Sequence, residues 1–282
     1  MKTLIVFILC FLNVKYILSQ NLNATKSTDS TETVWTQIKH DAQYTLKGVG
    51  HSLSRPIHWK GNDFAKLGIL FAGTAALTAA DNSTRDFVQN NKDHFPKALR
   101  DFGWYFGSPQ NYFAANAGLY GLGLITKNEN IRKTSVLIIS SSITTGLIQT
   151  FSKTAFGRAR PGSGLDHLDF DPFSSKARYH SFPSGHTALS ITMSHAIAKQ
   201  FENTWIKIGI YSIGAIPPIS RLIDDAHWIT DIAFSTALSI IVVDSIDKFL
   251  FNEKAYDYPQ KKKQMSWNLR FSTNQIGIVG TF

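Results

Sequence analysis

The sequence predicts an all-α fold, a helical bundle with about six core helices, peripheral helices and a possible short C-terminal β-strand. Three observations support this prediction. Apolar residues make up 43% of the 282-residue chain, enough for a sizeable core. Strand signals are weak before residue 264. The chain contains six apolar segments of helical length, at residues 65–80, 110–126, 133–152, 186–200, 204–219 and 228–250.

The first 19 residues are typical of a secretory signal peptide. A basic start at Lys2 precedes an apolar run from Thr3 to Val14, and Ser19 offers a small residue before the cut. We therefore expect an exported protein, periplasmic or in the cell envelope and possibly membrane-associated, with a retained anchor as the alternative. The chain's single cysteine, Cys10, lies inside this segment, so the mature chain would contain no disulfide.

The rest of the chain divides into three predicted parts. Residues 20–60 form a polar leader and a peripheral helix, residues 61–252 the helical-bundle domain, and residues 253–282 a tail. Within the bundle domain, 84–104 is an amphipathic connection with Pro96 at a helix start. In the tail, 266–282 partly alternates polar and apolar residues and is interpreted as a strand packing on the bundle.

The apolar segments could be buried core helices or membrane spans. A span needs about 20 apolar residues. The charge-free segment 134–151 is the best candidate, whereas other segments are shorter or carry charges. The mean hydropathy is slightly negative, at −0.09. We favour buried helices of a soluble domain and leave open a membrane-embedded form with possible membrane contact.

The formal net charge of +9 suits anionic partners such as an anionic membrane surface or phosphorylated substrates. A nucleic-acid partner is excluded, because basic and aromatic residues are not interleaved and the protein is expected to be exported. The oligomeric state is not indicated by any pattern in the sequence.

Three short clusters carry candidate chemistry, all near the ends of apolar segments. They are KTAFGRARP with Lys153 and Arg160, PSGH with Ser184, Gly185 and His186, and SRLIDDAHWITD with Arg221, His227 and Asp231. Each cluster alone also fits ordinary structure: cations at a helix C-terminus, a serine N-cap, or a histidine and an aspartate four residues apart on one helix.

Taken together, the clusters predict a phosphoryl-transfer site. Lys153, Arg160 and Arg221 would supply positive charge for phosphate oxygens. A helix N-terminus at Ser184–His186 would supply N–H donors and a favourable dipole for the anion. His227, oriented by Asp231, suits a nucleophile, and His186 suits the acid that protonates the leaving oxygen. No cluster with metal-ligand spacing accompanies them, so no metal is expected.

The three motifs, in this order and with this spacing, resemble the type 2 phosphatidic acid phosphatase and vanadium haloperoxidase superfamily over about residues 65–250. The resemblance implies that Lys153, Arg160, Arg221, Ser184 and Gly185 bind phosphate. It implies a transient phosphohistidine on His227 with Asp231 supporting it, and proton donation by His186. The implied activity is metal-independent hydrolysis of phosphomonoesters, with phosphorylated lipids or small phosphoesters as substrates.

Two alternatives remain at this point. In the first, a haloperoxidase, the same phosphate-binding residues would hold vanadate, and this is the one case in which a cofactor is expected. In the second, the fold would serve as a non-catalytic envelope lipid-binding protein. Relatives often have glycine where this chain has Asp225 and Ser235. Asp225 would either raise the pKa of His227 or face solvent, and Ser235 would be accommodated by repacking between helices.

Substrate choice is expected to depend on segments 84–110 and 162–182, which would rim the entrance. Four aromatic residues in these segments would either shelter a lipid chain or belong to the core: Trp104, Phe170, Phe173 and Tyr179.

Overall fold

The computed structural model describes residues 33–257, 266–272 and 275–281. The predicted signal peptide lies outside these residues. The chain divides into two compact units, Met1–Ile38 and Lys39–Phe282, with the boundary inside the first described helix. The predicted four-part domain division stays a prediction.

Helices dominate the described chain, as predicted. The α-helices are α3 (Val34–Ser54), α4 (Gly61–Leu77), α5 (Asp81–Asn90), α6 (Lys97–Gly107), α7 (Pro109–Ile125), α8 (Glu129–Phe156), α9 (Gly185–Ala198), α10 (Thr204–Ile223) and α11 (Ile229–Asp247). The 3₁₀ turns are η1 (Arg55–His58), η2 (Thr78–Ala80), η3 (Lys92–His94), η4 (Pro161–Ser163) and η5 (Ala177–Tyr179), and η6 (Lys248–Asn252) is a π-helical turn.

The helix boundaries follow from local capping signals. The Asn128 side chain accepts a hydrogen bond from the Ile131 N–H at 3.1 Å and begins α8, which ends at Gly157 with φ +57°. Asn203 caps α10 in the same way. The predicted helix start at Pro96 is confirmed, because α6 begins at the next residue. The amphipathic connection 84–104 therefore divides between α5 and α6.

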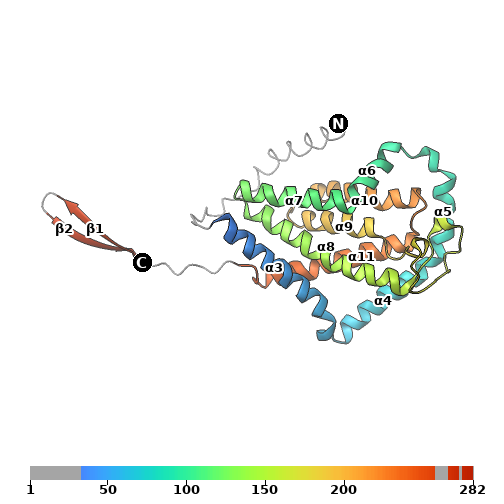
Figure 1. Cartoon of the computed structure of the whole chain (residues 1–282), viewed down its shortest axis with the longest axis horizontal. Helices are drawn as coiled ribbons and strands as arrows, with labels where there is room; N and C mark the ends of the chain where they lie inside the picture. Colours follow the sequence, from blue (N-terminus) through green and yellow to red (C-terminus); the bar gives the residue numbers. More distant parts are fainter. Residues whose placement is uncertain (1–32, 258–265, 273–274, 282) are drawn as a thin grey trace. The chain divides into compact units, whose positions relative to one another are not determined.

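Helix α9 lies at the centre of the bundle and packs against α8, α10 and α11 (Figure 1). Nine of its 14 residues are buried. The apolar cluster beside it combines residues of α7, α8, α9 and α11, and includes Tyr112, Leu137, Met193 and Val243. The prediction of six core helices does not hold for the first apolar segment, because α4, which covers most of that segment, contains no buried residue.

Four helical stretches are long and apolar enough to cross a membrane: Gly61–Asn90, Glu129–Phe156, Thr204–Ile223 and Ile229–Asn252. In the first, no part of the apolar window is buried within the protein. Large apolar side chains are also exposed on other helices, including Ile125 (84%), Phe151 (74%) and Trp205 (79%). Water does not favour so much exposed apolar surface, whereas lipid does. These findings favour membrane association over the soluble bundle that the sequence led us to prefer.

Small polar residues fill much of the interior face of α8. The buried side chains there include Ser140, Ser142 and Thr144, and each donates to a backbone carbonyl one turn earlier in the helix. Short side chains allow neighbouring helices to approach closely in lipid, where helices gain no hydrophobic energy from association.

The tail differs in detail from the single strand that was predicted. It forms two antiparallel strands, β1 (Ser266–Ser272) and β2 (Gln275–Thr281), with Ser266 opposite Thr281 and Ser272 opposite Gln275. The 17-residue segment is long for one strand and satisfies its backbone groups by pairing with itself. The predicted packing of this tail on the bundle is left untested.

A buried ion pair joins α3 to the bundle. Arg132 Nε donates to Asp41 Oδ2 at 2.7 Å, and both side chains are at most 4% exposed. Tyr120 donates to the same oxygen at 2.7 Å, and Tyr256 donates to the other. Asp41 is thus the acceptor that holds together α3, α7, α8 and the segment after η6.

Replacing Asp41 by alanine should destabilise the protein strongly, because it leaves the Arg132 charge buried without its carboxylate. Loss of one partner of a buried pair costs about 3–5 kcal/mol. Thermal unfolding in detergent measures the effect. Glu129→Ala is the matched control, since Glu129 is half exposed in its pair with Lys133 and such a pair is worth about 0–1 kcal/mol. Equal shifts for both variants would contradict this role of Asp41.

Candidate active site

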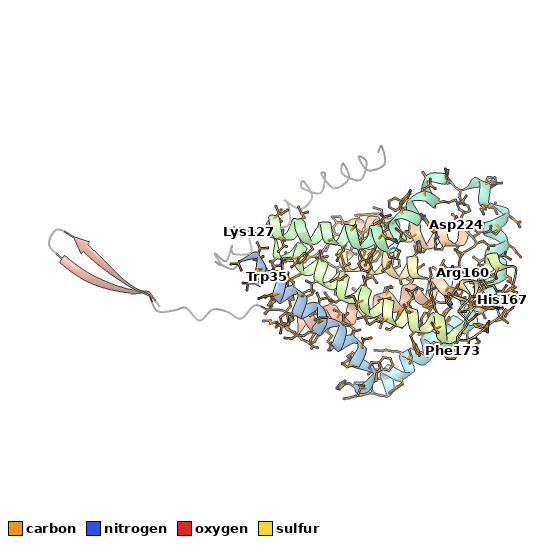
Figure 2. All side chains as sticks on the ribbon, in the orientation of Figure 1. Trp35, Lys127, Arg160, His167, Phe173 and Asp224 are labelled. Carbon is orange, nitrogen blue, oxygen red and sulfur yellow. The ribbon has the colours of Figure 1, made fainter. Side chains whose placement is uncertain are left out.

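The predicted site residues lie at one end of the bundle, where α8 ends and α9 and α11 begin. Figure 2 labels Arg160 and Asp224 at this end and Lys127 at the other. Lys153 lies in the last turn of α8, and Gly185 and His186 open α9. Arg221 lies in the last turn of α10, and Asp231 in the first turn of α11.

Two of the predicted cations converge on a single oxygen atom. Lys153 Nζ donates to the backbone carbonyl of His180 at 2.6 Å, and Arg160 Nη2 donates to the same carbonyl at 3.1 Å. Arg160 Nη1 also donates to the Ala226 carbonyl, next to His227, at 2.9 Å. Within the described part of the chain, both side chains are held by neutral carbonyls and neither forms an ion pair with a carboxylate.

The PSGH motif forms the N-terminus of α9. Ser184 is fully buried as the N-cap, and its N–H donates to the Asp231 backbone carbonyl at 3.3 Å, which joins the second motif to the third. The Ser184 hydroxyl accepts from Thr187 at 3.0 Å. His186 Nε2 is buried without a hydrogen-bond partner in the structure. A buried ring nitrogen without a hydrogen-bond partner destabilises the folded protein, unless a bound ligand supplies that partner.

His227 is nearly buried, at 5% exposure, and its Nδ1 lies 3.4 Å from Asp231 Oδ2. With Nδ1–H directed at this carboxylate, the lone pair of the ring lies on Nε2. Asp231 is fully buried, and the same Oδ2 accepts from Ser181 Oγ at 2.5 Å and from the Trp228 N–H at 2.9 Å. The carboxylate is therefore fixed by several donors besides the imidazole.

Arg158 is a further part of the site that the sequence analysis did not assign a role. Its side chain is 3% exposed, and its Nη1 donates to Asp231 Oδ1 at 2.7 Å. Its Nη2 donates to Asp81 Oδ2 at 2.6 Å. Asp81 in turn accepts from the Thr230 N–H at 3.1 Å. Arg158 lies in the first motif two residues before Arg160, but no pattern in the sequence indicates its distant partner Asp81.

Arg221 is held by an acidic neighbour and by an aromatic ring. Its Nη2 donates to Asp224 Oδ2 at 2.6 Å, and its Cζ lies 4.8 Å from the centroid of a Trp104 ring. The Trp104 ring also lies 5.5 Å from the His186 ring. Asp224 Oδ1 accepts from Arg100 at 2.9 Å. Trp104 and Arg100, both on α6, thus border the third motif.

Two glycines allow α6 to approach these motifs closely. A Cβ on Gly107 would lie 2.6 Å from His186 Cδ2, and a Cβ on Gly103 would collide with the Ser220 side chain. Neither position has room for a larger residue unless a site residue moves. The sequence analysis missed this role of the two glycines, because their spacing alone does not show what they face.

The two departures from the family pattern have structural explanations. Asp225 has φ +53°, a backbone conformation that glycine adopts without strain, and its carboxylate accepts from Arg85 Nε and Nη2 at 2.8 and 2.7 Å. Its charge is therefore paired with Arg85. Ser235 is fully buried and donates to the Asp231 carbonyl at 2.7 Å.

Burial and positive charge keep both site histidines neutral. Burial lowers the pKa of His227 to about 3, with further lowering by Lys153 and Arg160, while Asp231 opposes the change. The suggested rise in this pKa because of Asp225 was thus wrong. Burial, followed by Arg221, Arg160 and Lys153, lowers the pKa of His186 to about 4. Lys153 and Arg160 thus lower the pKa of both rings.

The aromatic residues of the proposed rim are mostly exposed. Phe173 is 76% exposed, Trp104 54% and Phe170 44%, whereas Tyr179 is buried at 9%. Among the described residues no group of three or more histidine, cysteine, aspartate or glutamate side chains could hold a metal ion. The motif residues therefore combine basic side chains with a neutral imidazole, that of His227, whose Nδ1 lies 3.4 Å from the buried Asp231 carboxylate.

Residues 134–252 match the family model described as the PAP2 superfamily. The resemblance inferred from the three motifs is confirmed, and the matched segment contains the motif residues Lys153, Arg160, His186, Arg221 and His227.

Curated relatives match part of the chain. A lipid A 1-phosphatase of Porphyromonas gingivalis is 26% identical over 118 residues, which cover 40% of this chain and 24% of the relative. A lipid A 4'-phosphatase of the same bacterium is 30% identical over 108 residues, covering 38% of this chain and 46% of the relative. The chain spans less than half the length of these curated relatives.

Two solved structures are similar to the chain. Aquifex aeolicus LpxE has 19% identity and a TM-score of 0.42, covering 58% of this chain and 93% of that chain. A transmembrane PAP2 type phosphatidylglycerolphosphate phosphatase from Bacillus subtilis has 17% identity and a TM-score of 0.47, covering 69% and 97%.

Binding of inorganic phosphate should raise the pKa of His186, because the anion offsets the cations that lower it in the free protein. His186 should titrate near pH 4 without phosphate and at a clearly higher pH with it, so that it takes up a proton as the anion binds. NMR titration of ring-labelled histidine measures both values, and the Lys153→Met variant should show a smaller shift. An unchanged titration under saturating phosphate would refute an anion site beside His186.

Proposed function

We propose that the protein is a metal-independent phosphatase that hydrolyses phosphomonoesters, in particular lipid phosphates. One observation carries the proposal: the buried imidazole of His227 has one nitrogen 3.4 Å from Asp231, and Lys153 and Arg160, which lower its pKa, donate to backbone carbonyls. A phosphoryl group needs such positive charge around its oxygens and a nucleophile in line with the leaving group.

Lys153, Arg160 and Arg221 would bind the phosphate oxygens, with the Ser184 hydroxyl and the Gly185 N–H completing the cradle. Arg221 would have to share its guanidinium between the phosphate and Asp224, to which it donates at 2.6 Å. Burial lowers the pKa of Arg160 because it disfavours the charged guanidinium. An anion bound beside the guanidinium would stabilise the charged form and offset this effect.

In the first step, the lone pair of His227 Nε2 attacks phosphorus while the bond from phosphorus to the leaving oxygen breaks. Asp231 and Arg158 fix the ring, and Asp231 stabilises the positive charge that the ring acquires. His186, protonated when the anionic substrate binds, donates its proton to the leaving oxygen. The products of this step are a free alcohol and a phosphohistidine.

In the second step, water attacks phosphorus and gives a proton to His186, which became neutral in the first step. The bond between phosphorus and Nε2 breaks, so that His227 regains its lone pair and inorganic phosphate is released. The two steps together hydrolyse one ester bond and restore both imidazoles, without a metal ion or another cofactor.

A lipid substrate is supported by two lines of observation. The matched relatives are named lipid A phosphatases. The chain has four stretches able to cross a membrane, and the site lies where two of these stretches, in α8 and α10, end. Export to the periplasm or cell envelope remains part of the proposal and rests on the first 19 residues of the sequence.

The direct test is phosphate release by the detergent-purified chain, in the presence of a metal chelator. The substrates are phosphatidic acid, phosphatidylglycerol phosphate, polyprenyl pyrophosphate, lipid A and a soluble aryl phosphate. His227→Ala should reduce turnover by at least about a thousandfold, since removal of a nucleophile has effects of this order. Acid-labile ³²P-labelling of the unsubstituted chain, absent in the variant, would identify the phosphohistidine. Undiminished turnover by His227→Ala would refute the mechanism.

The same assay tests the close approach of α6. Gly107→Ala should lower kcat by about tenfold to a hundredfold, because the new methyl group would displace the His186 ring from the leaving oxygen. Gly118→Ala is the matched control, as a Cβ there has no neighbour within 4 Å. If both variants turn over equally, α6 does not position His186.

A further inference from the structure

Helix α5 contacts the segment that carries His227 through one of its faces. Asp81, Arg85 and Gln89 are spaced four residues apart, so their side chains lie on the same side of this helix. All three form hydrogen bonds with residues 222–230, which join the end of α10 to the start of α11. One helix outside the three motifs therefore contacts the whole length of the third motif's turn.

The two helices that flank His227 are both capped from α5. Gln89 Nε2 donates to the Leu222 carbonyl at 3.0 Å, in the last turn of α10. Asp81 Oδ1 accepts from the Thr230 N–H at 3.1 Å, in the first turn of α11. Helix ends carry backbone groups without partners inside the helix, and the dipole favours a carboxylate at the start. Side chains of α5 thus fix both ends of the connection that contains His227.

Arg85 holds the middle of this connection, residues 224–228, which we call the His227 loop. Its Nε and Nη2 donate to the two carboxylate oxygens of Asp225 at 2.8 and 2.7 Å. Two parallel bonds between a guanidinium and a carboxylate fix direction as well as distance. Asp225 has φ +53°, a backbone conformation that residues other than glycine rarely adopt. A contact that holds its side chain therefore stabilises this turn of the loop.

The backbone after Arg85's partner leads directly to the site. The Asp225 carbonyl accepts from the Gly162 N–H at 2.9 Å. The next carbonyl, that of Ala226, accepts from Arg160 Nη1 at 2.9 Å, and His227 is the following residue. A displacement of Asp225 would therefore reach both Arg160 and His227 through neighbouring peptide units.

We propose that α5 is a positioning element for the His227 ring and that Arg85 is its decisive contact. The pair of Arg85 with Asp225 keeps the His227 loop in the conformation that directs the ring at phosphorus. The proposal rests on the proposed function and adds a helix outside residues 134–252, which match the family model. Asp225 has a role here that the glycine of relatives could not perform, because glycine offers Arg85 no side-chain acceptor.

Arg85 is the residue to test, because its side chain is 34% exposed and its loss leaves no fully buried charge unpaired. Arg85→Met should lower kcat by about tenfold and leave KM within about twofold, since the variant misplaces the nucleophile and keeps Lys153 for binding. Arg85→Lys keeps the charge without the two-bond contact and should lie between. Phosphate release from phosphatidic acid and from a soluble aryl phosphate measures both constants, and the loss should be the same for the two substrates.

Asp225→Asn should lower kcat as far as Arg85→Met does. The variant with both substitutions should be no slower than either single variant, because both remove the same contact. Lys66→Met on α4 is the matched control, since it removes one positive charge from an exposed side chain and should leave kcat unchanged. Thermal unfolding in detergent should shift by less than about 4 °C in the Arg85 variants, as expected for a partly exposed pair.

Three results would overturn this role of Arg85. The first is a lower unfolding temperature with unchanged kcat in Arg85→Met, which is the signature of a purely structural contact. The second is a rise in KM alone, which would mean that Arg85 acts through its charge on the phosphate. The third is a loss that multiplies in the double variant, which would mean that Arg85 and Asp225 act separately.

If neither substrate releases phosphate even with the unsubstituted chain, the proposed function itself fails, and the ring position is then measured by NMR of ¹⁵N-labelled histidine. The His227 ring signals should shift in Arg85→Met and return part of the way in Arg85→Lys, whereas Lys66→Met should leave them in place. Unchanged His227 signals in Arg85→Met would refute the positioning role of α5.

Discussion

The site depends on one buried interaction, the ion pair between Arg158 and Asp231. The two side chains are at most 3% exposed, so each needs the other to remain charged inside the protein. The pair decides which way the Asp231 carboxylate faces, and through it the orientation of the His227 ring. Because Asp81 completes the network from α5, a residue far from the motifs in sequence contributes to the geometry of the imidazole.

Much of the fold could be predicted from the sequence, because helix boundaries are encoded locally. Asn128, Asn203 and Gly157 are caps that a reader of the sequence can recognise, and apolar runs of the right length lie between them. Whether an apolar helix faces the core or the outside is decided by neighbours distant in sequence. For that reason α4 was wrongly counted in the core and the soluble interpretation was favoured.

Only part of the candidate site could be predicted from the sequence. The motif residues could be recognised because their side-chain types and spacing match the needs of a phosphoryl group. The residues that neutralise or orient these side chains could not be recognised. Arg158 and Asp81, for example, form a buried pair but are far apart in the sequence, and no motif links them. The same holds for Arg85, which pairs with Asp225 and so removes the extra negative charge that the sequence suggested near the phosphate.

The two glycines of α6 also constrain how the protein can change over time. Gly103 and Gly107 have only a hydrogen atom as side chain, so the backbone of α6 lies close to Ser220 and His186. Substitutions on α6 are therefore accommodated more easily at exposed positions such as Asp101 than at Gly103 or Gly107. The side of α6 that faces Ser220 and His186 is fixed by steric contact, so the exposed side of this helix can change without moving these residues.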